Sequence, residues 1–297
     1  MMKKSNLSWE GVYDPTGYMF SFAKSLTCAV KNSAYADLAE DVVAVSGFAF
    51  RMWVSPDLCP SATSIWQFDR QKPWVEMSGL RCEQIDRLWG QDAVEEAKRL
   101  EALALIRRSI DGGTAVVSWD IGVCEWGLII GYDDETETLA TLPITGTEGT
   151  MPYVQLGKRE LPILNVLAIT GCEARPADEL LAGTMKLAAS HLRGEEWCDN
   201  AKGLAAYPAL IGHYEAEDKT KALSWNMEYF LGTYAPLKWY AWKFFEKYGR
   251  ADLADCYRRV HECWMEAFSH RREPELAAAK LREAETLERE ALAMMEA

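Results

Sequence analysis

The stretch from Thr114 to Leu142 constrains the fold most, because it contains three short apolar segments separated by brief turns. The segments are Ala115–Val117, Trp126–Ile130 and Thr138–Leu142, and glycines interrupt the chain between them. Two parallel strands need a crossover of a dozen or more residues, and these connections are shorter than that. The sequence therefore predicts a meander of three antiparallel strands.

The segments around this meander mix helical and strand patterns. Before it, the residue pattern predicts a helix over Tyr18–Ala39, a strand over Phe48–Val54, and helical spacing over Cys82–Trp89 and Asp92–Asp111. After it, the apolar run Ile163–Thr170 predicts a buried strand. Strands and helices that are not arranged in regular alternation indicate an α+β fold.

From Arg175 onward every segment has a helical pattern. We therefore divide the chain into an α+β domain, 1–174, and a helical C-terminal region, 175–297. The helices predicted in that region are Asp178–Leu192, Ala201–Glu215, Leu223–Tyr248, Asp252–Phe268 and Pro274–Ala297.

The net charge of −13 on 297 residues argues against nucleic acid and anionic membranes as partners. Such partners require a surplus of basic residues to neutralise phosphates. The sequence contains no run of about 18 apolar residues, so we expect no membrane span. The start, MMKKSNLSWEG, lacks the apolar centre of a signal peptide. We therefore expect a cytoplasmic protein.

The eight cysteines are scattered without CxxC pairs, which favours reduced, buried thiols over disulfides or a zinc site. Cys256, His261 and Cys263 come nearest to a metal-ligand set. Their spacing of five and then two residues does not put all three on one helix face. We expect neither a bound metal nor a cofactor.

Three features together resemble bacterial papain-like proteins: a helix bearing Cys28, the segment LAEDVVAVSGFAFRM (Leu38–Met52), and a strand that ends in GLIIGYDD (Gly127–Asp134). The nearest families are the N-terminal domain of the butirosin acyltransferase type and the C39-like cysteine peptidases. The resemblance covers residues 15–171. It implies a papain-like antiparallel sheet with packed helices, in which a Cys on the first helix faces a His at the start of a strand. Cys28 matches the nucleophile position.

The chain departs from this pattern where the catalytic partners belong. Glu125 stands in place of the expected His, and Leu142–Pro143 stand in place of the residue that orients it. The stretch Ser21–Thr27 also lacks the Gln that serves as an oxyanion donor. A thiol without a base and without oxyanion donors loses most of its catalytic power. Ordinary papain-like proteolysis is therefore not expected.

The first functional hypothesis is a papain-like scaffold that is not a peptidase and binds a small molecule or a peptide in the former active-site cleft. Trp126, Phe48 and Phe50 are the candidate ligand-binding residues. The aromatic residues of Trp225–Tyr248 also suit a homodimer contact, since aromatic side chains dominate both cores and interfaces.

Two alternatives remain open. The first is a thiol-dependent acyltransferase or amidase with Cys28 as nucleophile, whose base is Glu125, His191 or His213, because catalytic partners need only be close in space. The second is a structural or interaction protein with an unrelated α+β fold.

Overall fold

The computed structural model describes residues 2–64 and 67–297, which form two compact units. The sequence-based boundary at residue 174 assigns every earlier residue to one domain. In the structure, two segments that precede residue 174 belong to the second unit. The first unit comprises Met1–Val12, Ser21–Val42 and Gln67–Ala174, and the second comprises Tyr13–Phe20, Val43–Trp66 and Arg175–Ala297.

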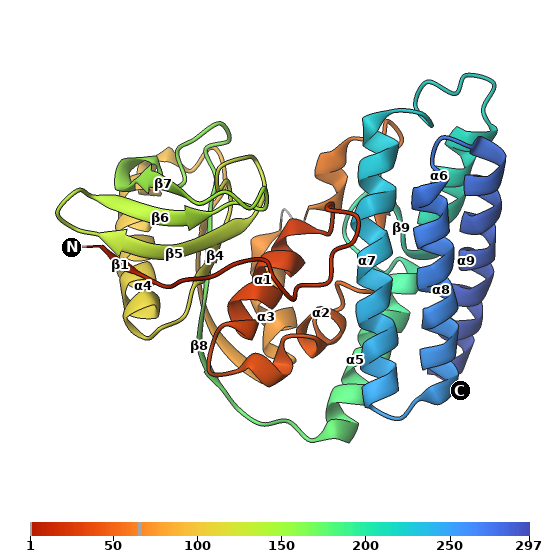
Figure 1. The fold of residues 1–297 in the computed structure, drawn as a ribbon, viewed down its shortest axis with the longest axis horizontal. Helices are drawn as coiled ribbons and strands as arrows, with labels where there is room; N and C mark the ends of the chain where they lie inside the picture. Colours follow the sequence, from red (N-terminus) through yellow and green to blue (C-terminus); the bar gives the residue numbers. More distant parts are fainter. Residues whose placement is uncertain (1, 65–66) are drawn as a thin grey trace. The chain divides into compact units, whose positions relative to one another are not determined.

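The first unit is built on a seven-stranded antiparallel sheet with the order β3-β8-β4-β5-β6-β7, and β1 pairs with β5 (Figure 1). The three-stranded meander predicted from the sequence is confirmed as β4, β5 and β6. The strands are β1 (Lys3–Lys4), β3 (Leu80–Arg87), β4 (Val116–Ser118), β5 (Gly127–Asp133), β6 (Thr138–Leu142), β7 (Gly149–Pro152) and β8 (Leu164–Cys172).

Two helices pack on this sheet, α1 (Ser21–Lys31) and α4 (Glu95–Asp111). Because side chains alternate along a strand, each face of the sheet has its own core. Val116 and Ile129 join Ile106 of α4 in one buried cluster. Trp126 contacts Phe22 of α1 with ring centroids 5.7 Å apart. A shorter helix, α3 (Gln71–Glu76), packs against β3, and α2 (Asp41–Val45) spans the point where the chain passes into the second unit.

Gly131 allows β1 to pair with β5. A Cβ atom at this position would lie 2.4 Å from the carbonyl oxygen of Lys3 and 2.9 Å from the Cα of Lys4. The register of β5 against β6 shifts between Ile129 and Gly131, as at a β-bulge. Only glycine permits this approach of two backbones.

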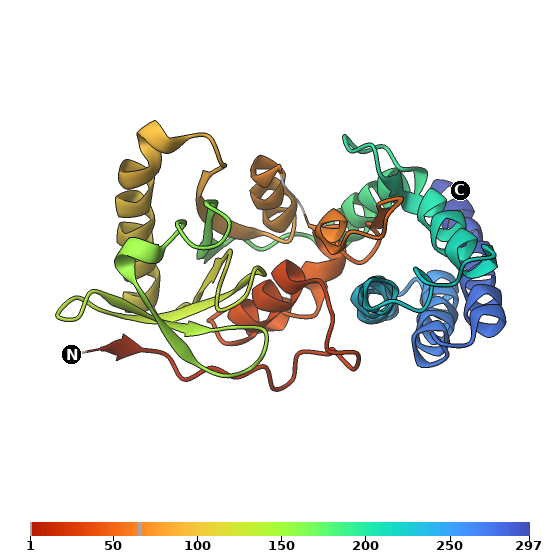
Figure 2. The same ribbon diagram turned by 90° about the horizontal axis from the view of Figure 1, so that it is seen from above.

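The second unit is a set of packed helices, in which α7 contacts α8 and α8 contacts α9. Figure 2 shows α7 and α8 nearly end-on beside α9. The helical character predicted for the C-terminal region is confirmed, and a two-stranded pair precedes α6. The elements are β2 (Trp53–Val54), α5 (Ala177–Arg193), β9 (Ala201–Lys202), α6 (Ala206–Glu215), α7 (Trp225–Lys247), α8 (Ala251–Ser269) and α9 (Pro274–Glu296).

Three of the predicted elements differ from the structure. Of the helix predicted over Tyr18–Ala39, α1 covers only Ser21–Lys31. Cys82–Trp89 does not form a helix, because β3 occupies Leu80–Arg87 and pairs with β8 along its whole length. The spacing of Ile85, Leu88 and Trp89 imitates a helix, but the long-range pairing with β8 decides the conformation.

Phe48–Val54 is a strand only at Trp53 and Val54. Successive turns precede them, in which the N–H groups of Phe50 and Arg51 both donate to the carbonyl oxygen of Gly47.

No helix among the described residues combines the length and the apolar character that a membrane span needs.

Candidate functional site

The first residue of α1 meets the residue two positions before β5. Ser21 Oγ donates a hydrogen bond to Glu125 Oε2 at 2.5 Å, and the backbone N–H of Trp126 donates to Ser21 Oγ at 3.3 Å. Ser21 is buried and Glu125 is half-buried. The hydroxyl also lies at the positive end of the α1 dipole, which favours a neighbouring carboxylate. A hydroxyl and a carboxylate therefore occupy the helix start and the strand entrance.

A buried hydrogen-bond chain fixes Trp126 behind this pair. The Nε1–H of Trp126 donates to Asn165 Oδ1 at 2.9 Å, and Asn165 Nδ2 donates to Gln71 Oε1 at 2.9 Å. Asn165 and Gln71 are both fully buried. Because each acceptor has one well-placed donor, the indole ring is held in a single orientation under the site.

The turn between β4 and β5 carries a second carboxyl group, that of Asp120. The backbone N–H of Ile121 donates to the carbonyl oxygen of Glu125 at 3.2 Å, which closes the turn directly after Asp120. Asp120 is 4% exposed, has a φ of +57°, and its Oδ2 atom has no hydrogen-bond partner among the described residues. Burial raises the pKa of this carboxyl above its usual range.

Two residues of the segment after Gly157 contact this turn. Arg159 donates to the carbonyl oxygen of Asp120 at 2.9 Å and lies 3.7 Å from its Oδ1 atom. Cys124 Sγ lies 3.3 Å from Glu160 Oε2, and burial together with this carboxylate raises the pKa of the Cys124 thiol to about 11. The surroundings thus contain three carboxyl groups, Asp120, Glu125 and Glu160, and one guanidinium.

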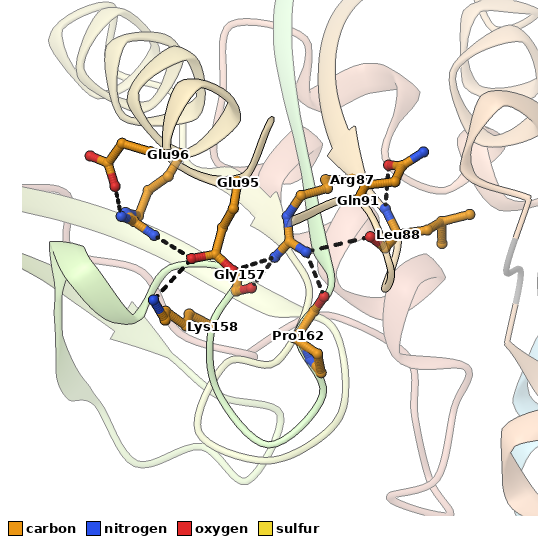
Figure 3. Close-up of polar contacts among 9 residues, drawn as sticks. Arg87, Leu88, Gln91, Glu95, Glu96, Gly157, Lys158 and Pro162 are labelled. Carbon is orange, nitrogen blue, oxygen red and sulfur yellow. Dashed lines mark hydrogen bonds and ion pairs between the residues drawn. The ribbon is translucent and has the colours of Figure 1, made fainter. Parts of the chain in front are cut away.

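A buried arginine holds the segment Gly157–Pro162 in place (Figure 3). The guanidinium of Arg87 is 1% exposed and donates to the carbonyl oxygens of Gly157 at 2.5 Å and Pro162 at 2.9 Å. Its counter-ion is Glu95 at 3.8 Å, which also pairs with Lys158 at 3.0 Å. The planar fork of an arginine suits this role because it reaches several carbonyls at once. Arg87 therefore positions the segment that carries Arg159 and Glu160.

Cys28 lies in the middle of α1, two turns beyond Ser21, because the helix begins at residue 21. Seven helical residues rise by about 10.5 Å along the axis. The thiol is fully buried, donates to the carbonyl oxygen of Ser8 at 3.3 Å, and has a pKa raised to about 11 by burial. Glu125 instead accepts its hydrogen bond from Ser21, at the start of α1.

The remaining candidate ligand-binding residues belong to the second unit, where both are buried. Phe48 contacts Phe20 with ring centroids 5.7 Å apart, and Phe50 contacts Tyr257 at 5.4 Å. These contacts are those of a packed core.

Both histidines that were considered as bases also belong to the second unit. His213 on α6 is half-buried, and burial, helped by Lys221, lowers its pKa. His191 on α5 is buried and its Nδ1 atom pairs with Glu196. A Cβ atom on Gly47 would lie 2.5 Å from His191 Nε2, so the other ring nitrogen is packed against backbone.

Two residues of this site, Ser21 and Asp120, are absent from the sequence-based candidates. A serine ahead of an apolar helix and an aspartate in a turn are both common, so neither has a distinctive pattern. The glycine at position 122 was a sequence sign of a turn here, and in the structure it has a φ of +80°. Among the described residues, no three His, Cys, Asp or Glu side chains are arranged to hold a metal ion.

Comparison with known proteins gave no match for this chain, either to a protein-family model or to a curated protein sequence.

Proposed function

We propose that this protein is a papain-like scaffold that is not a peptidase and binds a small molecule or a peptide where papain-like enzymes have their active site. The observation that carries the proposal is the hydrogen bond between Ser21 at the start of α1 and Glu125 before β5. Glu125 stands where the resemblance implies the base, and its partner at the start of α1 is Ser21 rather than Cys28, which matches the nucleophile position. An antiparallel sheet with α1 packed on β4 and β5 also fits such a scaffold.

The two side chains do not suit peptidase chemistry. A serine hydroxyl is a poor nucleophile unless a base removes its proton, and a carboxylate is a weaker base for a hydroxyl than the imidazole of the usual enzyme pair. Cys28 does not replace it, because burial raises the pKa of its thiol to about 11. These facts favour binding over acyl transfer.

The charges around the pair indicate which ligands fit. Asp120 Oδ2 is a buried acceptor without a donor among the described residues, and a buried acceptor gains from a hydrogen bond. Glu160, whose Oε2 atom lies 3.3 Å from Cys124 Sγ, adds a second carboxylate to this turn, and Arg159 adds a guanidinium. A ligand with amine or amide N–H donors is therefore the best complement.

Rebuilding the enzyme pair tests the scaffold. We expect the double variant Ser21→Cys/Glu125→His to react with iodoacetamide at the introduced thiol at least tenfold faster than the single variant Ser21→Cys, because the imidazole accepts the proton. Ser25→Cys/Glu125→His is the matched control, since Ser25 is equally buried one turn later in α1. Equal rates in the two double variants would argue against a papain-like arrangement.

Thermal unfolding tests the binding. We expect dipeptides or primary amines to raise the Tm of the wild type, because a ligand at 100 times its Kd contributes about 2.7 kcal/mol. Asp120→Asn should abolish the increase, and Glu101→Gln, an exposed carboxylate on α4, should preserve it. Compounds that raise the Tm of the wild type and of Asp120→Asn by the same amount would argue against binding at Asp120.

A further inference from the structure

Three consecutive residues, Ser8, Trp9 and Glu10, lie across one face of α1. The carbonyl oxygen of Ser8 accepts a hydrogen bond from Cys28 Sγ at 3.3 Å. The carbonyl oxygen of Glu10 accepts one from Lys31 Nζ at 2.9 Å. The ammonium group of Lys24 lies 5.3 Å from the centre of the Trp9 ring. We call residues 8–10 the strap.

The three α1 residues that the strap engages form a single stripe. Positions 24, 28 and 31 are spaced by four and three residues, which puts them on the same helix face. Each strap residue contacts one of these three α1 residues, which lie on successive turns of the helix. The strap therefore covers this stripe as one piece.

The strap has its own anchors in the first unit. Trp9 Nε1 donates to the carbonyl oxygen of Pro143 at 3.0 Å. The N–H of Val12 donates to the carbonyl oxygen of Trp9 at 3.1 Å and closes a turn in which Gly11 has a φ of +75°. A Cβ atom at position 11 would lie 1.6 Å from Lys31 Nζ. The positive φ at position 11 favours glycine, and a side chain there would displace the Lys31 ammonium group from its contact.

Burial and the neighbouring side chains shift the pKa of the Cys28 thiol in opposite directions. Burial raises the pKa of the Cys28 thiol to about 11, whereas Lys31, the side-chain amide of Asn32 and Lys24 lower it. Asn32 Nδ2 lies 3.7 Å from the sulfur. Two ammonium groups and an amide donor are the surroundings that stabilise a thiolate once water reaches it.

We propose that the strap is a built-in cover for Cys28, and that lifting it converts an inert buried thiol into a reactive one between Lys24 and Lys31. This inference does not rest on the proposed binding function, since that function involves Ser21, Glu125 and Asp120. It assigns Cys28 a regulated accessibility that depends on residues 8–11.

The test measures alkylation of each cysteine by iodoacetamide, followed by mass spectrometry. Two variants weaken the strap by different means: Gly11→Ala through the backbone and Trp9→Ala through the lost anchor. A fall of the Cys28 pKa from about 11 to the ordinary 9.0 raises the thiolate fraction near neutral pH by roughly 100-fold. We expect the labelling of Cys28 to accelerate by at least tenfold in both variants.

Two controls make the result specific. Gly17→Ala introduces the same backbone strain, at a φ of +78°, where a Cβ atom meets nothing within 4 Å, so Cys28 should label at the wild-type rate. Cys256 is a buried thiol that donates to the carbonyl oxygen of Leu287 at 3.1 Å, and serves as the internal reference. Wild-type labelling of Cys28 in both strap variants would overturn the proposal, as would an equal acceleration at Cys256.

Discussion

Thr16 Oγ1 donates a hydrogen bond of 2.6 Å to the carbonyl oxygen of Gly232, in the middle of α7. This carbonyl lacks its normal helical donor because residue 236, four positions later, is a proline. The second unit thus supplies the missing donor from its N-terminal segment Tyr13–Phe20. A proline inside a buried helix is tolerated here because a side chain from elsewhere in the sequence satisfies the freed acceptor.

We predict that Thr16→Val lowers the free energy of unfolding by about 1–3 kcal/mol, because it leaves the carbonyl of Gly232 unpaired. Thr16→Ser retains the hydroxyl and should lose clearly less. Urea unfolding followed by circular dichroism measures both. If Thr16→Val lost no more stability than Thr16→Ser, the hydrogen bond to Gly232 would not be the stabilising contact.

Lys238 and Glu288 form a buried ion pair at 2.8 Å, with side-chain exposures of 1% and 0%. Tyr207 also donates to Glu288 at 3.0 Å. We predict that Lys238→Met lowers the free energy of unfolding by about 3–5 kcal/mol, since it leaves a buried carboxylate without its cation. Lys238→Met/Glu288→Leu should be less destabilised than the single variant. A double variant that unfolds as easily as the single one would show that packing dominates at this site.

Asp120 should make the protein less stable as the pH rises. Burial raises its folded-state pKa above the ordinary 3.8, so the folded protein holds this proton more tightly than the unfolded chain does. The stabilisation is therefore present at low pH and is lost as the pH rises from about 3.8 through the folded-state pKa. We predict that Asp120→Asn gains stability relative to the wild type across this window, measured as urea midpoints against pH.

Asp111 provides a control of opposite sign. Its hydrogen bonds from Lys3 and Tyr132 lower its pKa, so its contribution is lost as the pH falls through the folded-state value. Asp111→Asn should therefore lose stability relative to the wild type toward neutral pH. For Asp120 itself, urea midpoints that vary with pH in the same way in Asp120→Asn and in the wild type would contradict the predicted role of burial.

Arg87 should control the order of the segment Gly157–Pro162. A lysine cannot donate to two separate carbonyls in the fixed geometry of a guanidinium. We predict that Arg87→Lys accelerates tryptic cleavage after Lys158 or Arg159 by several-fold, because local opening exposes the backbone. Arg81→Lys, on the same strand with an exposed side chain paired to Glu173, should leave the cleavage rate unchanged. Equal rates in the two variants would mean that other contacts hold the segment.

Local pattern was enough for the parts of the fold in which neighbours in the chain are also neighbours in space. Thr114–Leu142 forms its meander and Pro274–Glu296 its helix because apolar spacing, short turns and helix propensity act over a few residues. The α+β class and the helical C-terminal part follow from the same signals.

Long-range partners decided what the pattern did not. β3 is a strand because β8, about eighty residues away, pairs with all of it. The partner of Glu125 at the start of α1 is Ser21, 104 positions earlier, while Cys28 lies beneath residues 8–10. The sequence by itself determined the local elements and the position of Glu125 before β5. Only the tertiary structure decided which side chain meets Glu125, because hydrogen bonding and burial depend on contacts in space rather than on order in the chain.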